Sequence, residues 1–410
     1  MNAIFTPADI LLPDFDRVDG TRYAVIACDQ FTSEKDYWDA AYETVGDAPS
    51  ALSMVLPEIY LSETEKRLSA IHAAMQSYEK DILRERKDAM IYLRRVQSDG
   101  KIRHGIIGKI DLEAYDYNKG SQSPVRATEG TVLSRIPPRA AVRREATLEL
   151  PHAMLLIDDK ENTVFSSLTG KESKMEKAYA FDLMLDGGSV EAYYLTDAQK
   201  ASVLAALEKI AAREGESGLC FAVGDGNHSL ATAKAIYEEE KQGYTGDTAC
   251  LASRYALCEV VNLHDDALVF EPIYRVVFHV DPEMLLSELR AYLSSLKGAA
   301  ARQTLTAVGK DIEETLVAET PVAALTVGTL QDFLDGYLAR HPEAEVDYIH
   351  GEDSLCKLAD TENAVGFLFN GMDKSELFPA VKADGALPRK TFSMGHARDK
   401  RYYIEARRIK

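Results

Sequence analysis

Long apolar runs are missing from this chain. No window approaches the roughly 18 consecutive apolar residues that a membrane helix needs, and residues 1–15 have neither a basic start nor a continuous apolar stretch. The sequence therefore predicts neither a membrane span nor a secretory signal. We expect a cytoplasmic protein without membrane partners.

Cysteine and histidine are few and scattered. The five cysteines form no Cys-x-x-Cys pair, and the nine histidines show no His-x-x-x-His spacing. Disulfide scaffolds and structural zinc sites depend on such patterns. We therefore predict no structural metal site.

The motifs of the commonest nucleotide and hydrolase folds are also absent. The chain has no Gly-x-x-x-x-Gly-Lys-Ser/Thr loop, no Gly-x-Gly-x-x-Gly after a first strand and no Gly-x-Ser-x-Gly turn. Each motif serves a fold-specific turn that its chemistry requires. The sequence thus gives no support to a P-loop, a Rossmann or an α/β-hydrolase enzyme.

The chain has fewer basic residues than acidic ones, 47 Lys and Arg against 66 Asp and Glu. The net charge of −19 argues against a nucleic-acid partner, because neutralisation of phosphates by Lys and Arg drives such binding. Two segments are nevertheless basic: residues 126–144 hold five Arg against one Glu, and residues 382–410 hold nine Lys or Arg against three acids. They either bind a small anionic ligand or are solvated strands that balance an acidic surface.

The 410 residues, 46% of them hydrophobic, suffice for two domains. Hairpins are predicted for 90–97 with 101–112 and for 180–185 with 189–195, mixed with helices, which indicates an α+β fold with a mixed sheet. A first strand is expected at 24–27, and capping boxes at 62–65 and 196–199 are expected to open helices. Strands at 276–280, 346–349 and 365–369 indicate a second, smaller α/β domain. We predict domains over 1–270 and 271–375, with 376–410 returning to the first domain and ending in a strand at 401–408.

The best site candidate is Val-Gly-Asp-Gly-Asn-His-Ser at 223–229. An apolar run at 218–223 predicts a buried strand before it, and the spacing of Leu230, Ala233 and Tyr237 predicts a helix after it. Such a turn aims backbone N–H groups and the helix dipole at one point, where an anion binds. The simpler interpretation is a sharp glycine turn with an Asn cap. We favour a site because an acid, an amide, an imidazole and a hydroxyl crowd the same turn. The candidate residues are Gly224, Asp225, Gly226, Asn227, His228 and Ser229.

Three further segments carry candidate residues. Segment 126–131 offers a cation, a carboxylate and hydroxyls, segment 387–395 offers a Lys with hydroxyls, and Asp29 with Gln30 follows the expected first strand. Arginine can grip a phosphate with two N–H groups. Each segment has an ordinary structural alternative, such as a surface ion pair or the end of a strand. The candidates from these segments are Arg126, Glu129, Thr131, Lys390, Thr391, Asp29 and Gln30.

Five segments, taken together and in order, resemble the family catalogued as domain of unknown function 1015 over essentially its full length. They are residues 29–32, 126–131, 223–230, 262–275 and 387–395. Membership in this family implies a fold more than an activity.

The 223–229 loop is also similar to the Asp-Gly-His-His loop of the ParB/sulfiredoxin-like superfamily. Asp225, Gly226 and His228 match, and Asn227 stands in place of the first His. This superfamily includes partition proteins, sulfiredoxins and kinases of free serine. Sulfiredoxin chemistry needs a cysteine in the loop, and a partition protein needs a basic DNA-binding domain. The chain shows neither, so the resemblance implies a ParB/sulfiredoxin-like core from the small-molecule phosphotransfer branch.

These observations lead to the hypothesis of phosphoryl transfer to or from a small hydroxylated metabolite, with free serine or phosphoserine as the first candidate. The loop would hold the phosphate, while Arg126 and Lys390 neutralise it. Asp225 or Glu129 would deprotonate the attacking hydroxyl, and His228 would act as an acid. Mg²⁺ on one of those carboxylates and ATP or ADP are the expected cofactors. The rival hypothesis is a non-catalytic regulatory protein that binds a nucleotide or a phosphorylated metabolite.

Overall fold

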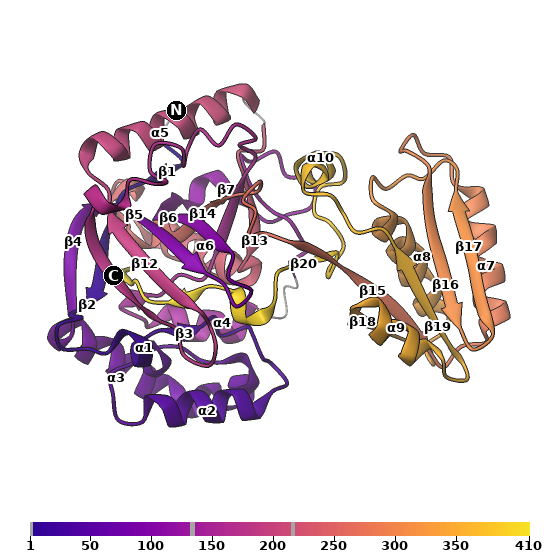
Figure 1. The fold of residues 1–410 in the computed structure, drawn as a ribbon, viewed down its shortest axis with the longest axis horizontal. Helices are drawn as coiled ribbons and strands as arrows, with labels where there is room; N and C mark the ends of the chain where they lie inside the picture. The colour runs from indigo at the N-terminus through magenta and orange to yellow at the C-terminus, as the bar shows by residue number, and fades with distance from the viewer. Residues whose placement is uncertain (1–2, 132–135, 215–217) are drawn as a thin grey trace. The chain divides into compact units, whose positions relative to one another are not determined.

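The computed structural model describes residues 3–131, 136–214 and 218–410, which form two compact units (Figure 1). Unit 1 comprises Met1–Ala127, Thr131–Leu268 and His396–Lys410, and unit 2 comprises Thr128–Gly130 and Val269–Gly395. The division differs from the predicted one at its C-terminal boundary. Residues 376–395 belong to unit 2, because the strand at 392–394 pairs with the strand that opens this unit. The return to unit 1 begins at His396.

Unit 1 is built on a ten-stranded mixed sheet, counted over the described residues. Its order is β11-β12-β5-β6-β14-β10-β13-β8-β7, with β1 pairing with β6. These strands are β1 (Phe5–Thr6), β5 (Ile91–Val96), β6 (Ile102–Asp111), β7 (Tyr115–Asp116), β8 (Val125–Ala127), β10 (Met154–Ile157), β11 (Glu176–Asp182), β12 (Ser189–Tyr194), β13 (Phe221–Asp225) and β14 (Tyr255–Asn262). The pairs β14–β10, β13–β8 and β8–β7 are parallel, and the others are antiparallel. The predicted α+β class with a mixed sheet is confirmed.

Three short strand pairs complete unit 1. They are β2 (Ala8–Pro13) with β4 (Leu83–Ala89), β3 (Val25–Ile26) with β21 (Tyr402–Tyr403), and β9 (Leu148–Glu149) with β22 (Arg407–Arg408). The single strand predicted at 401–408 is therefore two short strands on different partners. The strand expected at 24–27 exists as β3, although β1 and β2 precede it.

The helices of unit 1 are α1 (Gly20–Tyr23), α2 (Lys35–Val45), α3 (Thr64–Asp81), α4 (Ile136–Arg144), α5 (Asp197–Glu214) and α6 (Asn227–Gly243). Figure 1 shows α5 and the pair α2 and α3 at opposite edges of this unit. The capping box predicted at 196–199 is confirmed, since the Thr196 N–H donates to Gln199 Oε1 at 2.9 Å. The one predicted at 62–65 is wrong: a 3₁₀ helix over Glu58–Glu63 runs into α3, and the Thr64 hydroxyl bonds backward to the Leu61 carbonyl.

Both predicted hairpins are confirmed by the antiparallel pairs β5–β6 and β11–β12. The sequence succeeds here because each turn matches its chemistry. Gly100, at the end of the first turn, has φ +82°, which glycine adopts without steric cost.

Unit 2 contains a six-stranded sheet in the order β17-β16-β19-β15-β18, with β20 on β15. Its strands are β15 (Phe270–Phe278), β16 (Gln303–Gly309), β17 (Ile312–Ala318), β18 (Glu345–His350), β19 (Ala364–Phe369) and β20 (Phe392–Met394). Its helices are α7 (Pro282–Ser295), α8 (Thr326–Arg340), α9 (Glu352–Ala359) and α10 (Leu377–Asp384). Every described pairing in this sheet is antiparallel. Unit 2 is therefore an α+β domain, whereas the sequence analysis predicted an α/β domain.

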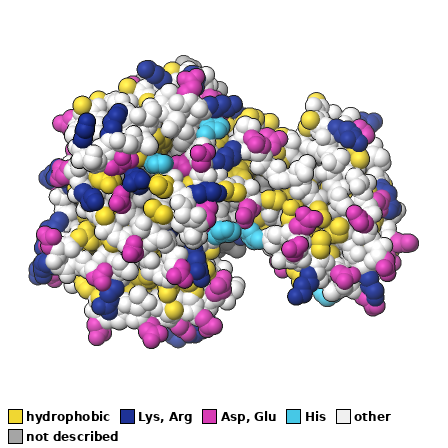
Figure 2. All heavy atoms as spheres, viewed as in Figure 1, with side chains coloured by type: hydrophobic (Ala, Val, Ile, Leu, Met, Phe, Trp, Pro, Cys, Tyr) yellow, Lys and Arg dark blue, Asp and Glu magenta, His cyan; other side chains and the backbone are white. Residues whose placement is uncertain are grey.

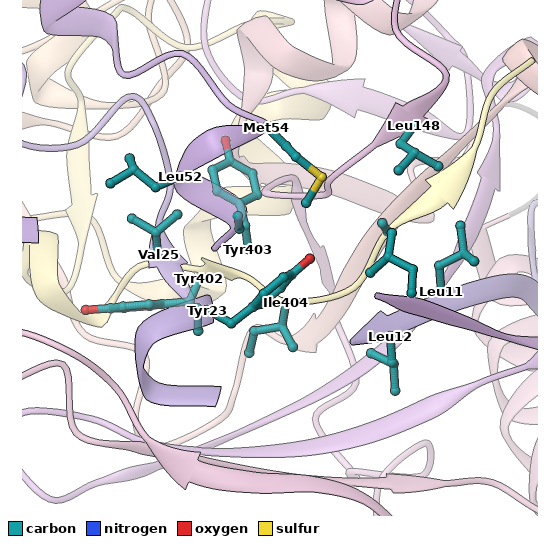
Figure 3. Close-up of a cluster of buried hydrophobic side chains, with 14 of the residues drawn as sticks. Leu11, Leu12, Tyr23, Val25, Leu52, Met54, Leu148, Tyr402, Tyr403 and Ile404 are labelled. Atoms are coloured by element: carbon teal, nitrogen blue, oxygen red, sulfur yellow. The ribbon is translucent and has the colours of Figure 1, made fainter. Parts of the chain in front are cut away.

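The C-terminal segment is part of the core of unit 1. Tyr402, Tyr403 and Ile404 are buried with residues from β2, β3 and β9 (Figure 3). Two basic residues of this segment are buried as well: Arg401 and Arg407 are 3% and 6% exposed. Neither of the two interpretations offered for this basic segment therefore describes these arginines, which form ion pairs inside the protein. On the face shown in Figure 2, Lys and Arg side chains are interspersed with Asp and Glu.

Candidate functional site

The candidate loop has the predicted geometry. β13 ends at Asp225, Gly226 is the N-cap, and α6 begins at Asn227. Gly226 has φ +78° and ψ +25°, and a Cβ there would lie 2.8 Å from the Ala153 Cα and 3.0 Å from the His152 Cδ2. Both the left-handed backbone and the close approach require glycine. A glycine N-cap has no side chain to accept the first-turn N–H groups, so their acceptors must come from elsewhere.

Asp225 is held by its own loop and by the C-terminal segment. Its Oδ1 accepts the Gly226 N–H at 2.9 Å, and its Oδ2 lies 3.4 Å from Lys400 Nζ. The two side chains are only 14% and 12% exposed. This arrangement puts an acid and a fixed ammonium group beside the start of α6, where the helix dipole favours anions.

A second group of polar side chains lies between the end of β3 and the start of α6. Asp29 Oδ2 lies 3.7 Å from His152 Nε2, and His152 Nδ1 lies 2.6 Å from the Tyr403 hydroxyl. That hydroxyl also donates to Cys28 Sγ at 3.1 Å. Since His152 contacts Asp29 on one side and lies against Gly226 on the other, the segment 28–30 and the loop 224–229 meet at this histidine.

Protonation differs sharply within this cluster. Burial opposes ionisation of Asp29, but His152, the Gln30 amide and Lys400 outweigh it, and the pKa of the Asp29 carboxyl lies below its ordinary value. Burial raises the pKa of the Cys28 thiol to about 12 and that of the Tyr403 hydroxyl well above its usual range. At neutral pH the cluster therefore contains a carboxylate beside a neutral thiol and a neutral phenol. Cys28 is a poor nucleophile in this state.

A cavity of about 130 Å³ adjoins the cluster. Its lining includes the polar side chains of Cys28, His152, Ser229 and Tyr403. The rest of the wall is mainly apolar and comes from residues 54–61, α3, α4 and the segment after α4. Two ion pairs, Arg139 with Glu58 and Arg143 with Glu149, also reach the wall.

The remaining loop candidates lie in the first turn of α6. Asn227 Nδ2 donates to the Val223 carbonyl at 3.4 Å, so its amide bonds back to the strand and is not the helix cap. The carbonyl of His228 accepts the Thr232 hydroxyl at 2.7 Å. Ser229 faces the cavity. Gly224 is the penultimate residue of β13.

Arg126 and Thr131 belong to unit 1, on either side of a segment that does not. Arg126 lies on β8, paired with Ala222 of β13, and its Nε donates to the Ser123 carbonyl at 2.7 Å. Burial lowers the pKa of this guanidinium, although Cys220 opposes the shift. Thr131 is half-buried. Arg135, a further cation of this segment, lies outside the described residues.

Glu129, Lys390 and Thr391 belong to unit 2. The backbone of Glu129 is bridged to Leu387, so the segments 128–130 and 387–395 do meet there. Lys390 is exposed, and its carbonyl accepts a hydrogen bond from Arg275. The Thr391 hydroxyl is buried and donates to the Pro388 carbonyl at 2.7 Å. The Lys390 carbonyl and the Thr391 hydroxyl thus form hydrogen bonds that stabilise unit 2 itself.

Sequence reasoning missed His152, Tyr403 and Lys400. His152 and Tyr403 stand alone in the sequence, with no spacing that marks a site, and an isolated histidine or tyrosine is ordinarily a core residue. Lys400 could have been found, because the basic segment that contains it was noted. What was missing was the pairing of β21 with β3, which brings residues 396–403 to Asp29.

Residues 3–131, 136–214 and 218–410 contain no group of three or more His, Cys, Asp or Glu arranged to hold a metal ion. Over the same residues, no helix has the length and apolarity required to cross a membrane.

A family model described as protein of unknown function (DUF1015) matches residues 14–407. The chain belongs to this family. No curated protein matches it.

Several solved structures are similar to this chain at low identity. A free serine kinase variant in complex with AMP is similar to this chain with a TM-score of 0.39 and 12% identity, over 70% of this chain and 91% of that one. A C-terminally truncated SbnI from Staphylococcus aureus is similar with a TM-score of 0.37 and 10% identity, over 70% and 83%. A conserved hypothetical protein from Pyrococcus furiosus is similar with a TM-score of 0.34 and 11% identity, over 70% and 91%.

Proposed function

We propose that unit 1 catalyses phosphoryl transfer between a nucleotide and a small hydroxylated metabolite. The observation that carries the proposal is the junction of α6 with Asp29. The glycine-capped start of this helix, the ammonium group of Lys400 and an ionised carboxylate lie around His152. Phosphoryl transfer needs positioning and charge neutralisation more than covalent chemistry by the protein.

In this proposal the start of α6 and Lys400 hold the phosphoryl group that moves. The metabolite hydroxyl oxygen attacks the terminal phosphorus of ATP, the bond from that phosphorus to the bridging oxygen breaks, and ADP leaves with the bonding electrons. The hydroxyl proton passes to Asp29, and His152 fixes the orientation of this carboxylate. In a loose transition state the attacking oxygen gains little charge, so a carboxylate with a low pKa suffices as the proton acceptor.

In this proposal Asp29 takes the base role that the sequence analysis gave to Asp225 or Glu129, and the loop residues act on the phosphoryl group. His228 and Ser229, in the first turn of α6, would donate to phosphoryl oxygens. Asp225 would orient Lys400 and offer one ligand to a nucleotide-bound Mg²⁺, which commonly takes only one or two protein carboxylates. Glu129 and Lys390 belong to unit 2. The mechanism above uses residues of unit 1 alone and gives these two residues no role.

Phosphorus NMR of the full chain with Mg²⁺ tests the proposal. Phosphoserine with ADP and serine with ATP are the first substrate pairs, because the loop resembles that of serine kinases. We expect new phosphate resonances whose rate of appearance falls by about 100-fold or more in Asp29→Asn. The matched control is Asp186→Asn, the same chemical change on a side chain that is 89% exposed at a hairpin turn.

Equal turnover in the wild type, Asp29→Asn and His228→Ala would contradict the assignment of the site. Saturable nucleotide binding with no product from any hydroxylated compound would favour the non-catalytic, regulatory alternative.

A further inference from the structure

A largely apolar cavity of about 130 Å³ lies beside Ser229. Its walls include the buried side chains of Met54, Leu56, Met75 and Leu148, and Figure 3 shows Met54 and Leu148 in the same buried cluster as Tyr403. The cavity is also lined by His152, Ser229 and Tyr403 of the candidate site, which indicates a binding site.

We propose that this cavity binds the apolar body of the substrate that carries the reacting hydroxyl or phosphate. The inferred ligand is a compact ring or branched chain with its oxygen attached close to that body. This inference rests on the proposed function and specifies the class of its substrate. It differs from free serine, which has no apolar part.

The size of the cavity limits the ligand. An engineered cavity of about 150 Å³ in another protein holds benzene, so about 130 Å³ suits one ring or a branched chain of similar volume. Two fused rings need more space. A nucleotide also places a sugar between its base and its phosphates, whereas here Ser229 of the first turn of α6 lines the same cavity as the apolar residues.

The charges at the wall do not favour a zwitterion. Arg139 is paired with Glu58, and Arg143 is paired with Glu149, so opposite charges cancel at both places. An amino acid head group would lose its hydration in this apolar space without meeting an excess of either charge. The reactive oxygen of the ligand instead meets the polar side chains of His152, Ser229 and Tyr403 in the same lining.

The test compares three probes by calorimetry on the full chain: inorganic phosphate, phosphoserine and benzyl phosphate. We expect benzyl phosphate to bind at least about tenfold more tightly than phosphoserine, since burial of one ring is worth a factor of this order. Two substitutions fill the cavity from different sides. Ala146→Leu acts at a buried position, and Val142→Phe acts at a half-buried position that tolerates a larger side chain. Both should abolish the tenfold preference and leave phosphate binding within about twofold.

A fourth probe separates this inference from the proposed function. Fluorobenzyl alcohol carries no phosphate, and ¹⁹F NMR detects its binding directly. Binding that is lost in both filled variants would support the cavity assignment even if no phosphate probe binds, an outcome that would count against phosphoryl transfer alone. The inference would be overturned by equal affinity for phosphoserine and benzyl phosphate, or by filled variants that bind the aromatic probes as the wild type does.

Discussion

The two units differ in where their ion pairs lie. Unit 1 has surface pairs such as Lys35–Asp39, but it also has buried ones: Glu259 is paired with Arg103 and Arg401, and Glu149 with Arg143 and Arg407, all at 14% exposure or less. In unit 2 the described ion pairs lie at the surface. Four of them are Arg290–Glu314, Arg302–Glu319, Lys310–Glu362 and Arg340–Glu288, with every side chain at least 32% exposed.

The difference shows how unit 1 fixes its C-terminal segment. A buried ion pair gains little over a hydrophobic pair, because both ions lose their hydration, but the loss of one partner leaves a charge stranded. Arg401 pairs with Glu259 of β14 and with Glu405 of its own segment. These pairs therefore specify where residues 400–405 lie, and with them Lys400 and Tyr403 of the candidate site.

The largest expected effect comes from Arg401→Met. It removes the positive charge between two fully buried carboxylates, so we expect unit 1 to lose about 3–5 kcal/mol of unfolding free energy. Urea denaturation followed by the fluorescence of Trp38, the single tryptophan of the chain and a buried residue of unit 1, reports on this unit. A loss below about 1 kcal/mol would show that the ion pairs of Arg401 do not fix the position of residues 400–405.

Acid should unfold unit 1 before unit 2. Burial opposes ionisation of Glu149 and Glu259, but their arginine partners outweigh it and hold both pKa values below the ordinary value of 4.5. A depressed pKa contributes stability above the unfolded pKa, and this stability is lost as pH falls through the folded value. We expect the Trp38 signal to change as the pH is lowered from about 4.5, while part of the far-ultraviolet circular dichroism persists. Simultaneous loss of both signals would contradict the comparison.

Two glycines with nearly the same positive φ should differ in how much their replacement by alanine destabilises unit 1. Gly226→Ala places a Cβ 2.8 Å from the Ala153 backbone at φ +78°, whereas Gly170→Ala has φ +79° and open space around its Cβ. We expect Gly170→Ala to cost about 1 kcal/mol from its backbone conformation. Gly226→Ala should cost about 2 kcal/mol more, because the clash involves backbone atoms. Equal costs would mean that the loop can move away from the 152–153 segment.

The smallest effect is expected for Arg290→Met in unit 2. Arg290 is 50% exposed and Glu314 is 32% exposed, so water screens the pair and solvates the remaining carboxylate. We expect a change of at most about 1 kcal/mol. Thermal unfolding of this variant beside Arg401→Met, at one pH and one salt concentration, measures the contrast between the two units directly.

Local rules predicted local structure well. The hairpins at Gly100 and Gly187–Gly188, the cap at Thr196 and the glycine turn at Gly226 all depend on neighbours within a few residues, and all are present. The helix start at 62–65 was wrong because a 3₁₀ helix, packed by tertiary contacts, took the place of the expected cap.

Half of the candidate site escaped prediction for a different reason. The loop 224–229 and Asp29 were identified because turn chemistry and strand ends are visible in sequence. Tyr403 and Lys400 reach them through the pairing of β21 with β3, which joins residues more than 370 positions apart, and His152 reaches the loop through the pairing of β10 with β13. Whether an arginine is buried with a glutamate or exposed to solvent is decided by the same kind of distant pairing, and the basic segments were ambiguous for that reason.

The order of the chain has a consequence for synthesis on the ribosome. Glu259 and Glu149 are translated 142 and 258 residues before Arg401 and Arg407, and the larger segment of unit 2 lies between them. A nascent unit 1 must therefore keep these carboxylates hydrated, or bound elsewhere, until unit 2 has been made. Domains usually fold in the order in which they emerge. Here the larger unit begins first and is completed last, and its candidate site cannot assemble before the final segment arrives.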